Sequence, residues 1–205
     1  MLHFATSTMS WLVEALARAL LWAILALAAV AAGPAAANPV KSLYTTIELS
    51  QCRKVSRRED GNAWECPGLR GFPVYVAEGD HRQFVSLGAG AAKRKAAQQT
   101  LRPFNSIFTK AGARATIEWR YVIREGRQLP YAAIVRFHTQ RDRERGDVIV
   151  VMKVSETDTC HVALIDALAN PDPLILARNI ADQEARKFDC STEARPRGAT
   201  GRSPM

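Results

Sequence analysis

The sequence predicts an α+β domain: one antiparallel sheet of about six to eight short strands, with one short and one long C-terminal helix on one face. Three observations lead to this fold class. Short stretches of alternating apolar and polar residues recur between residues 43 and 167. Turn residues separate these stretches, and such short connections favour antiparallel pairing. An apolar stripe at helical spacing follows at residues 173–188.

The first 37 residues have the features of a signal peptide. Residues 19–32 are an uninterrupted apolar run, and Ala35-Ala36-Ala37 is an A-x-A cleavage site. The run is shorter than the about 20 residues that a membrane span needs. We therefore expect cleavage after Ala37, with translation starting at Met1 or Met9, no transmembrane span after cleavage, and a periplasmic or secreted protein.

The predicted elements of the first half are short. In chain order they are a strand at 43–49, a strand at 64–66, the strands FPVYVAE and RQFVSLG, and a short helix at residues 91–100. The hairpin between FPVYVAE and RQFVSLG turns at Gly79-Asp80-His81. These elements belong to residues 38–190, which we interpret as a single domain.

The second half carries the stronger signals. ATIEWRYVI places Ile117, Trp119, Tyr121 and Ile123 on one face, and YAAIVRFHT places Tyr131, Ala133, Val135 and Phe137 on one face. VIVVMKV is apolar throughout, as a strand buried on both faces is. A last strand is expected at residues 160–167, and a helix at 173–188 with Asp172 as its N-cap. Residues 191–205 show no apolar periodicity and are predicted to be a disordered tail.

The chain has four cysteines, Cys52, Cys66, Cys160 and Cys190. An even number of cysteines behind a signal peptide indicates disulfides, because the compartment is oxidising. Cys52 and Cys66 flank a polar run with an Asp60-Gly61 turn, so they can face each other across a hairpin. We therefore expect this pair to form a disulfide.

Cys160, His161 and Asp166 first suggest a catalytic site. Side chains alternate along a strand, however, so His161 points to the face opposite that of Cys160 and Asp166. No proton transfer among the three is therefore arranged. A strand at 160–167 spans about 26 Å, and a helix at 173–188 returns about 24 Å. The sequence therefore favours a Cys160–Cys190 disulfide.

Two further segments are candidate sites. Gly88, Gly90, Lys93, Arg94 and Lys95 combine a glycine turn with basic residues, which favours contact with an anion, although an ordinary turn with a solvated basic face explains the same pattern.

Glu118 lies on the polar face of its strand. With Arg136 or His138 opposite, it would act as a general acid or base only if burial raised its pKa. An exposed ion pair is the simpler interpretation of that face. Neither His81 nor His138 has a second ligand at metal spacing, so no metal or cofactor is expected.

The formal net charge is +8, and it stays +8 after residues 1–37 are removed, because they hold only Glu14 and Arg18. Such a charge attracts polyanions. Nucleic acid is an unsuitable partner for an exported protein, so anionic lipid, lipopolysaccharide or acidic polysaccharide of the cell envelope is the expected class. The basic residues form separate patches, and solubility with an arginine-rich composition is the simpler explanation of them.

The stretches WECPGLRGFPVYVAEGD, PFNSI and CHVALIDALAN, with Ala177, Arg178, Ala181 and Asp182 after them, resemble a group of small exported bacterial proteins. The resemblance covers residues 43 to about 190. It implies export and disulfide bonding, and it supplies no catalytic residue.

Together these patterns favour an exported, non-catalytic protein that binds an envelope polyanion or a protein partner. The alternative is a hydrolase-like enzyme with its site on the sheet face around Glu118. A third interpretation is a structural component of the envelope. The first two differ in whether ionisable groups from distant segments converge in a pocket.

Overall fold

The computed structural model describes residues 40–58, 61–109 and 114–205, so the predicted signal peptide and its cleavage site lie outside the described residues. The strands are β1 (Lys41–Glu48), β2 (Arg53–Arg58), β3 (Gly61–Leu69), β4 (Phe72–Gly79), β5 (Arg82–Leu87), β6 (Phe104–Ser106), β7 (Arg114–Arg124), β8 (Arg127–Arg141), β9 (Glu144–Val154), β10 (Thr159–Asp166) and β11 (Arg195–Pro196). The α-helix is α2 (Pro173–Glu184), and the 3₁₀ turns are η1 (Leu49–Gln51), η2 (Ala91–Lys93), η3 (Lys95–Gln98) and η4 (Ala185–Lys187).

The strands form two sheets. The large sheet has the order β1-β7-β8-β9-β10-β11, and β6 pairs with the second half of β8 beyond the end of β7. The small sheet is the meander β2-β3-β4-β5. All pairs are antiparallel except β10 with β11.

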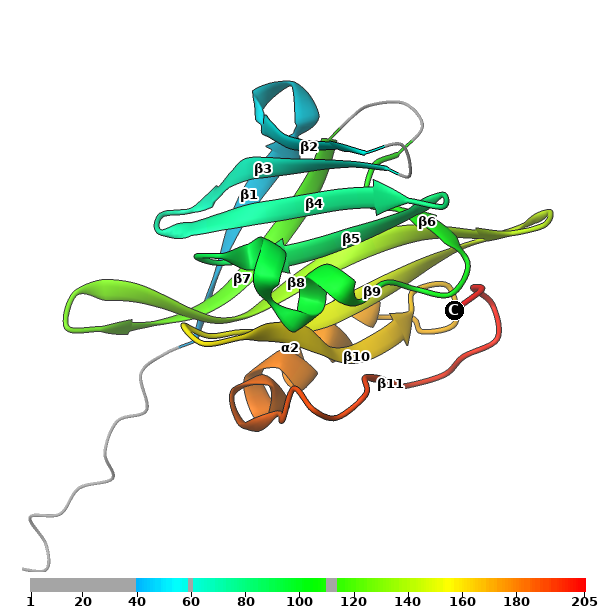
Figure 1. The fold of residues 1–205 in the computed structure, drawn as a ribbon. Helices are drawn as coiled ribbons and strands as arrows, with labels where there is room; N and C mark the ends of the chain where they lie inside the picture. Colours follow the sequence, from blue (N-terminus) through cyan, green and yellow to red (C-terminus); the bar gives the residue numbers. More distant parts are fainter. Residues whose placement is uncertain (1–39, 59–60, 110–113) are drawn as a thin grey trace, which may run out of the picture. The chain divides into compact units, whose positions relative to one another are not determined.

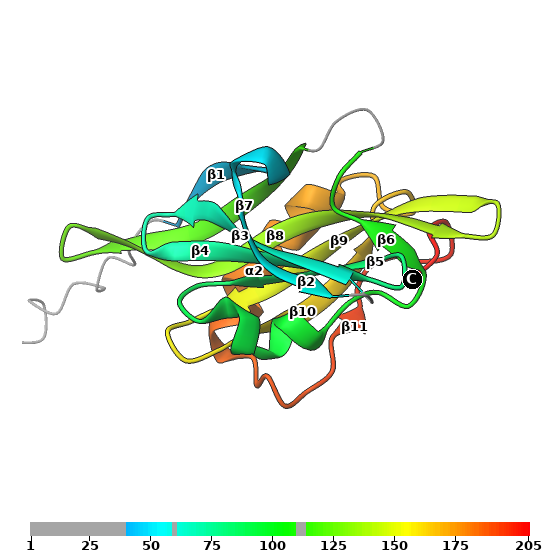
Figure 2. The same ribbon diagram turned by 45° about the horizontal axis from the view of Figure 1, so that its top comes forward.

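The two sheets pack face to face, and α2 covers the other face of the large sheet (Figures 1 and 2). One cluster of buried side chains lies between the sheets, including Val74 and Val85 from the small sheet and Trp119 and Phe137 from the large one. A second cluster lies beneath α2 and includes Ile149, Val151 and Ala177. The large sheet is therefore the central layer of three.

β9 is buried on both faces, as its apolar run predicts. Val148, Val150 and Met152 face the small sheet, whereas Ile149 and Val151 face α2. The neighbouring strand β8 departs from simple alternation. A bulge in the β7–β8 ladder leaves Tyr131 without a paired residue and turns it toward α2, although Ala133, Val135 and Phe137 face the small sheet as expected.

The predicted single sheet is wrong, because the strands divide into two sheets and β1 joins the later strands. Alternation shows which face of a strand is buried, but not which strand it pairs with. The fold is accordingly richer in sheet than the α+β class implies.

The predicted helix at 91–100 is two 3₁₀ turns, because Arg94 between them is extended. Such a short segment has little helical stability of its own. The last α-helix ends at Glu184, and η4 continues it.

The prediction of a disordered tail at 191–205 is also wrong. β11 pairs with β10, and Ser203 is buried. The amide groups of Arg202 and Ser203 donate hydrogen bonds to one carboxylate oxygen of Asp166, at 2.7 and 2.9 Å, and the Ser203 hydroxyl reaches the other oxygen at 2.6 Å. The segment is ordered by polar contacts to a distant strand, which apolar periodicity does not register.

Both predicted disulfides are present. Cys52 and Cys66 close the β2–β3 hairpin with 4.3 Å between their Cα atoms. Cys160 at the start of β10 is joined to Cys190 beyond η4, with 5.7 Å between the Cα atoms. One disulfide lies in the small sheet, and the other ties the large sheet to the helical layer.

Candidate functional site

Two groups of ionisable side chains meet on the large sheet. The first lies beneath α2 and contains Glu118 and Arg120, which are only 4 % and 9 % exposed. Alternation along β7 points both side chains away from the small sheet, so they face the helix. The polar sheet face expected from the sequence is therefore real, but α2 covers it.

Arg178 of α2 neutralises Glu118. Its Nε and Nη2 atoms donate to the two Glu118 carboxylate oxygens at 2.8 and 3.0 Å, and Ser42 of β1 donates a third hydrogen bond at 2.5 Å. Burial acts to raise the pKa of Glu118, but the hydrogen bonds from Arg178 and Ser42 outweigh it and hold the pKa below its usual value. Glu118 is therefore held as a carboxylate.

Asp182, one helical turn beyond Arg178, neutralises Arg120 in the same way. The Arg120 guanidinium donates to both Asp182 oxygens, at 2.9 and 2.6 Å, and the Tyr131 hydroxyl donates to Asp182 at 2.6 Å. Burial and this bond raise the pKa of Tyr131 to about 12. Each charge of the network has a partner, which is how buried ion pairs are tolerated.

This network fastens α2 to the large sheet and is not an open acid–base site. Glu118 lies opposite Ile134 in the β7–β8 ladder, so neither Arg136 nor His138 is its direct cross-strand partner. All three side chains nevertheless line one cleft, in which Glu118 is paired with Arg178. A carboxylate that is paired at both oxygens and has a lowered pKa is a poor general acid. Arg178 and Asp182, which the resemblance to exported proteins singled out, thus fasten the helix to the sheet.

The glycine turn that was expected to contact an anion packs against its own chain. Gly88 and Gly90 have positive φ values of 92° and 66°. Arg94 donates to the carbonyl oxygens of Ala89 and Glu156, and the Lys95 amine donates to that of Cys190.

The backbone amides of this turn are engaged too. Those of Ala91 and Lys93 donate to Gly88 and Gly90, and that of Lys95 donates to Asp158. An anion here would compete with bonds within the chain, and Lys93 is the basic side chain that remains exposed.

The second group of ionisable side chains opens into a cleft. Where β6, β8 and β9 lie side by side, two successive cross-strand rows share one face of the large sheet. We call these six residues the grid; its rows are Ser106–His138–Asp147 and Phe104–Gln140–Arg145. All six line a cleft of about 490 Å³, together with His81 and Phe108. We call it the end-of-sheet cleft. Its volume is in the range of small-ligand sites.

His138 has a defined orientation in the grid. Its Nδ1 atom lies 2.6 Å from one Asp147 oxygen, and the other Asp147 oxygen accepts a hydrogen bond from Arg136 at 3.3 Å. About a third of the His138 side chain is exposed. The Asp147 carboxylate thus fixes the ring by one nitrogen and leaves the second nitrogen for the cleft.

His138 also connects two clefts. A neighbouring cleft of about 510 Å³ lies toward α2 and shares His138 with the end-of-sheet cleft. Its wall includes Arg136 and Arg178, with Ile149 and Leu174 as apolar contacts. The imidazole therefore stands where the two clefts meet.

Aromatic side chains form another wall of the end-of-sheet cleft. His81, in the tight turn between β4 and β5, has a positive φ of 56° and packs against Phe104 with the ring centroids 5.1 Å apart and the ring planes tilted by 59°. Phe104 is 47 % exposed. An exposed phenylalanine beside polar groups in a hollow is the composition of a ligand site.

Ser106 closes the row next to His138. Its hydroxyl accepts a hydrogen bond from the Phe108 amide at 3.0 Å and lies 3.2 Å from the Gln83 side-chain oxygen. Gln83 belongs to β5, so this contact ties the small sheet to the edge of the large one. Beside it, the Asn105 side chain donates to the carbonyls of Leu101 and Pro103.

Sequence reasoning noticed His81 and His138 but missed Ser106, Asp147 and Arg145. Nothing local distinguishes these residues, because Arg145 and Asp147 lie in or beside the charged turn RDRERG. The sequence offered one signal, and only for Ser106: this residue lies in PFNSI, a stretch that the resemblance to exported proteins contains but does not explain. Their meeting depends on strand register, which is a property of the whole sheet.

The described residues thus define a class: a disulfide-bonded protein of two packed sheets and one helix, with a ligand-sized cleft at one end of its central sheet. In comparisons with protein-family models, curated proteins and solved structures, nothing matches this chain.

Proposed function

We propose that this chain is an exported binding protein that takes an anionic component of the cell envelope into the end-of-sheet cleft. The observation that carries the proposal is the contrast between the two groups of charges on the large sheet. Beneath α2 the charges neutralise one another. In the end-of-sheet cleft Asp147 pairs with His138, but Arg145 stands open beside His81 and an exposed Phe104. Among the described residues, Arg145 forms no ion pair.

The ligand class follows from the chemistry of the cleft. A guanidinium group recognises carboxylate, sulfate or phosphate, and the aromatic wall of Phe104 and Phe108 suits an apolar or ring-shaped part of the same molecule. The net charge of +8 raises the local concentration of anions around the protein. An acidic polysaccharide of the envelope meets both requirements, and it is the ligand that we propose.

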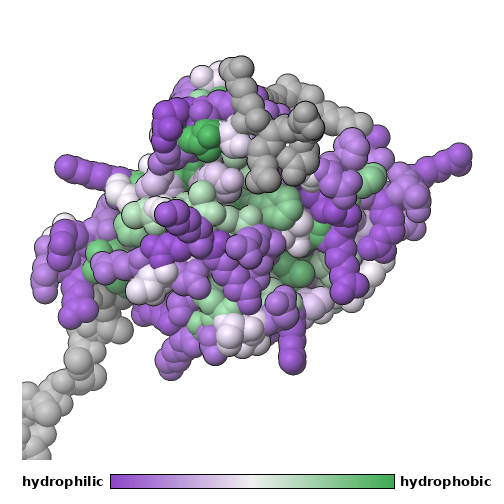
Figure 3. Space-filling model, in the orientation of Figure 1, coloured by the Kyte–Doolittle hydropathy of each residue, from purple (hydrophilic) through white to green (hydrophobic). Residues whose placement is uncertain are grey.

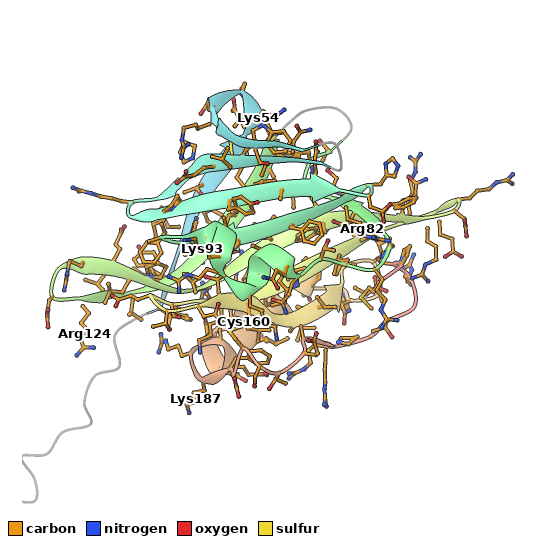
Figure 4. All side chains as sticks on the ribbon, in the orientation of Figure 1. Lys54, Arg82, Lys93, Arg124, Cys160 and Lys187 are labelled. Atoms are coloured by element: carbon orange, nitrogen blue, oxygen red, sulfur yellow. A yellow bond between two sulfur atoms is a disulfide. The ribbon has the colours of Figure 1, made fainter. Side chains whose placement is uncertain are left out.

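Diffuse charge alone is a weaker basis for binding. Lys54, Lys93, Arg124 and Lys187 are exposed and belong to different parts of the described chain (Figure 4). On the side shown in Figure 3, apolar residues form small patches separated by hydrophilic ones. Basic residues that are spread in this way attract anions without placing them, so specificity has to come from a cleft.

Export is part of the proposal. Two disulfides indicate an oxidising compartment, and the resemblance to exported proteins points the same way. In the part of the chain that the structure describes, no helix is both long and apolar enough to cross a membrane. We place the protein in the periplasm or outside the cell.

A calorimetric titration tests the proposal, with heparin as an acidic polysaccharide and dextran as a neutral one. The disulfide-bonded protein is expected to bind heparin at physiological salt and not dextran. Arg145→Gln should weaken heparin binding by about fivefold, because one charge contact in the cleft is lost. Arg124→Gln, in the β7–β8 hairpin, is the matched control and should bind nearly as tightly as the parent. Equal losses in both variants would show diffuse attraction and refute the assignment to the cleft.

A further inference from the structure

We propose that Ser106, His138 and Asp147 act as nucleophile, general base and orienting carboxylate in a site that hydrolyses a carboxylic ester. The inference rests on the proposed function only in that the substrate occupies the same end-of-sheet cleft. It is a separate claim about chemistry, and it replaces the expectation of a purely non-catalytic role.

The arrangement comes from the register of three adjacent strands. Ser106 of β6 pairs with His138 of β8, and His138 pairs with Asp147 of β9. Directly opposed residues in antiparallel strands project to the same face, with about 5 Å between their Cβ atoms. The imidazole therefore stands between a hydroxyl and a carboxylate. In the segment that first suggested a catalytic site, Cys160 and His161 are neighbours on one strand and diverge.

Asp147 positions the base. Its contact with Nδ1 of His138, at 2.6 Å, favours the tautomer with the proton on Nδ1 and leaves Nε2 as the proton acceptor. Arg136 holds its second oxygen, and the Ser203 hydroxyl accepts a hydrogen bond from the Asp147 backbone amide at 3.1 Å. Arg136 thus supports the carboxylate and Ser203 the backbone of Asp147, as an orienting group requires.

Ser106 needs one rotation to act. Its hydroxyl now bonds with the Phe108 backbone and lies against Gln83. Turning about the Cα–Cβ bond brings the hydroxyl toward its cross-strand neighbour His138. Catalytic hydrogen bonds are commonly long or misaligned without substrate and tighten when substrate binds.

The remaining parts of the site lie in the second row of the grid. Phe104, together with nearby Phe108, offers an apolar surface to the acyl group, and Arg145 is a cation for the developing oxyanion. All of them line the same cleft as Ser106, so one substrate can contact both rows. The substrate class is a short-chain carboxylic ester.

The chemistry balances with water as the only co-reactant. His138 Nε2 takes the proton of the Ser106 hydroxyl while the oxygen attacks the ester carbonyl carbon. The C–O bond to the alcohol then breaks, and the alcohol leaves with the proton from His138. Water, deprotonated by His138, attacks the acyl-serine and releases the carboxylic acid, which restores the Ser106 hydroxyl.

The test uses p-nitrophenyl acetate and p-nitrophenyl butyrate with the disulfide-bonded protein. The parent protein should release p-nitrophenol faster than Ser106→Ala, His138→Gln and Asp147→Asn, with the rate in each variant lower by at least tenfold. Ser56→Ala, a partly exposed serine on β2, is the matched control and should keep the parent rate. Equal rates in the parent and Ser106→Ala would overturn the proposal, and so would a rate that falls only in the His138 variant.

A second measurement needs no variant. A fluorophosphonate probe added to the parent protein should modify Ser106, as located by mass spectrometry of its peptide. Modification confined to other residues, or none, refutes the nucleophile even where the variants fail to fold. Heparin binding, measured on the parent and on Ser106→Ala, separates the two claims. A parent protein that binds heparin but hydrolyses neither ester overturns only the catalytic claim. A parent protein that does not bind heparin overturns the proposed function.

Discussion

At the residue scale, the burial of His161 has a cost in stability. It is 3 % exposed, and its Nε2 atom has no hydrogen-bond partner among the described residues. It lies opposite Met152, whose side chain faces the core between the sheets. Burial lowers the pKa of His161 from 6.5 to about 4, because a charged imidazole is unfavourable there. The folded protein therefore needs this ring neutral.

This burial predicts a loss of stability in acid. Between pH 6.5 and about 4 the unfolded chain takes up a proton at His161 that the folded chain does not, so the free energy of unfolding falls as the pH falls. The full loss is about 3 kcal/mol, and it is complete below pH 4. Urea unfolding at a series of pH values measures it. In His161→Leu the slope over this range should be smaller; an unchanged slope would contradict the assignment. Carboxylates titrate in both the parent and the variant, so their contribution cancels in the difference between the two slopes.

At the element scale, residues 195–205 behave as part of the large sheet. The Ser203 hydroxyl lies 2.6 Å from an Asp166 carboxylate oxygen and 3.0 Å from the Asp147 backbone oxygen, so it joins the end of β10 to the start of β9. Asp166 also accepts amide hydrogen bonds from Leu168 and Ala169. Burial acts to raise the pKa of Asp166, and these bonds together hold it below its usual value.

Removing the Ser203 hydroxyl should destabilise residues 195–205. Ser203→Ala is expected to lower the free energy of unfolding by about 1–2 kcal/mol, because buried hydrogen-bond partners are left unpaired. Hydrogen exchange should become faster at the Arg202 and Ser203 amides. Ser191→Ala removes an exposed hydroxyl that bonds only to Asp189, and it should have little effect on either quantity. Equal changes in the two variants would mean that the segment is not held by Ser203.

At the scale of the whole molecule, each disulfide secures a different layer. Cys52–Cys66 lies in the small sheet, and Cys160–Cys190 joins the large sheet to the segment after α2. The residues they join are 14 and 30 positions apart. In the chain-entropy model the longer loop gives the larger stabilisation, about 3.6 kcal/mol against about 3.0 kcal/mol.

The native protein should therefore show no reactive thiol until it is reduced, and four thiols after reduction and unfolding. The double variant Cys160→Ser with Cys190→Ser should lose more unfolding free energy than the double variant of Cys52 and Cys66. Thiol titration and denaturant unfolding measure the two effects. Four reactive thiols in the native exported protein would refute the oxidising compartment.

Much of the local structure could be predicted from sequence. The two-faced burial of β9, the hairpin joined by Cys52 and Cys66, and the start of α2 at Pro173 all follow from nearby residues. The bulge that reverses Tyr131 could not be predicted, because it depends on the β7–β8 ladder. The anion contact at Gly88–Lys95 stays a prediction.

By itself the sequence determined the longer strands, which cysteines pair and that the surface is basic, because these depend on short-range periodicity, loop length and charge counts. It did not predict β2, β6 or β11, which lack an apolar alternation. Only the tertiary structure decided that α2 covers Glu118, that residues 195–205 join the sheet, and that Ser106, His138 and Asp147 share one row. Each of these depends on register or packing between segments far apart in the chain, where a shift of one residue reverses which side chains meet.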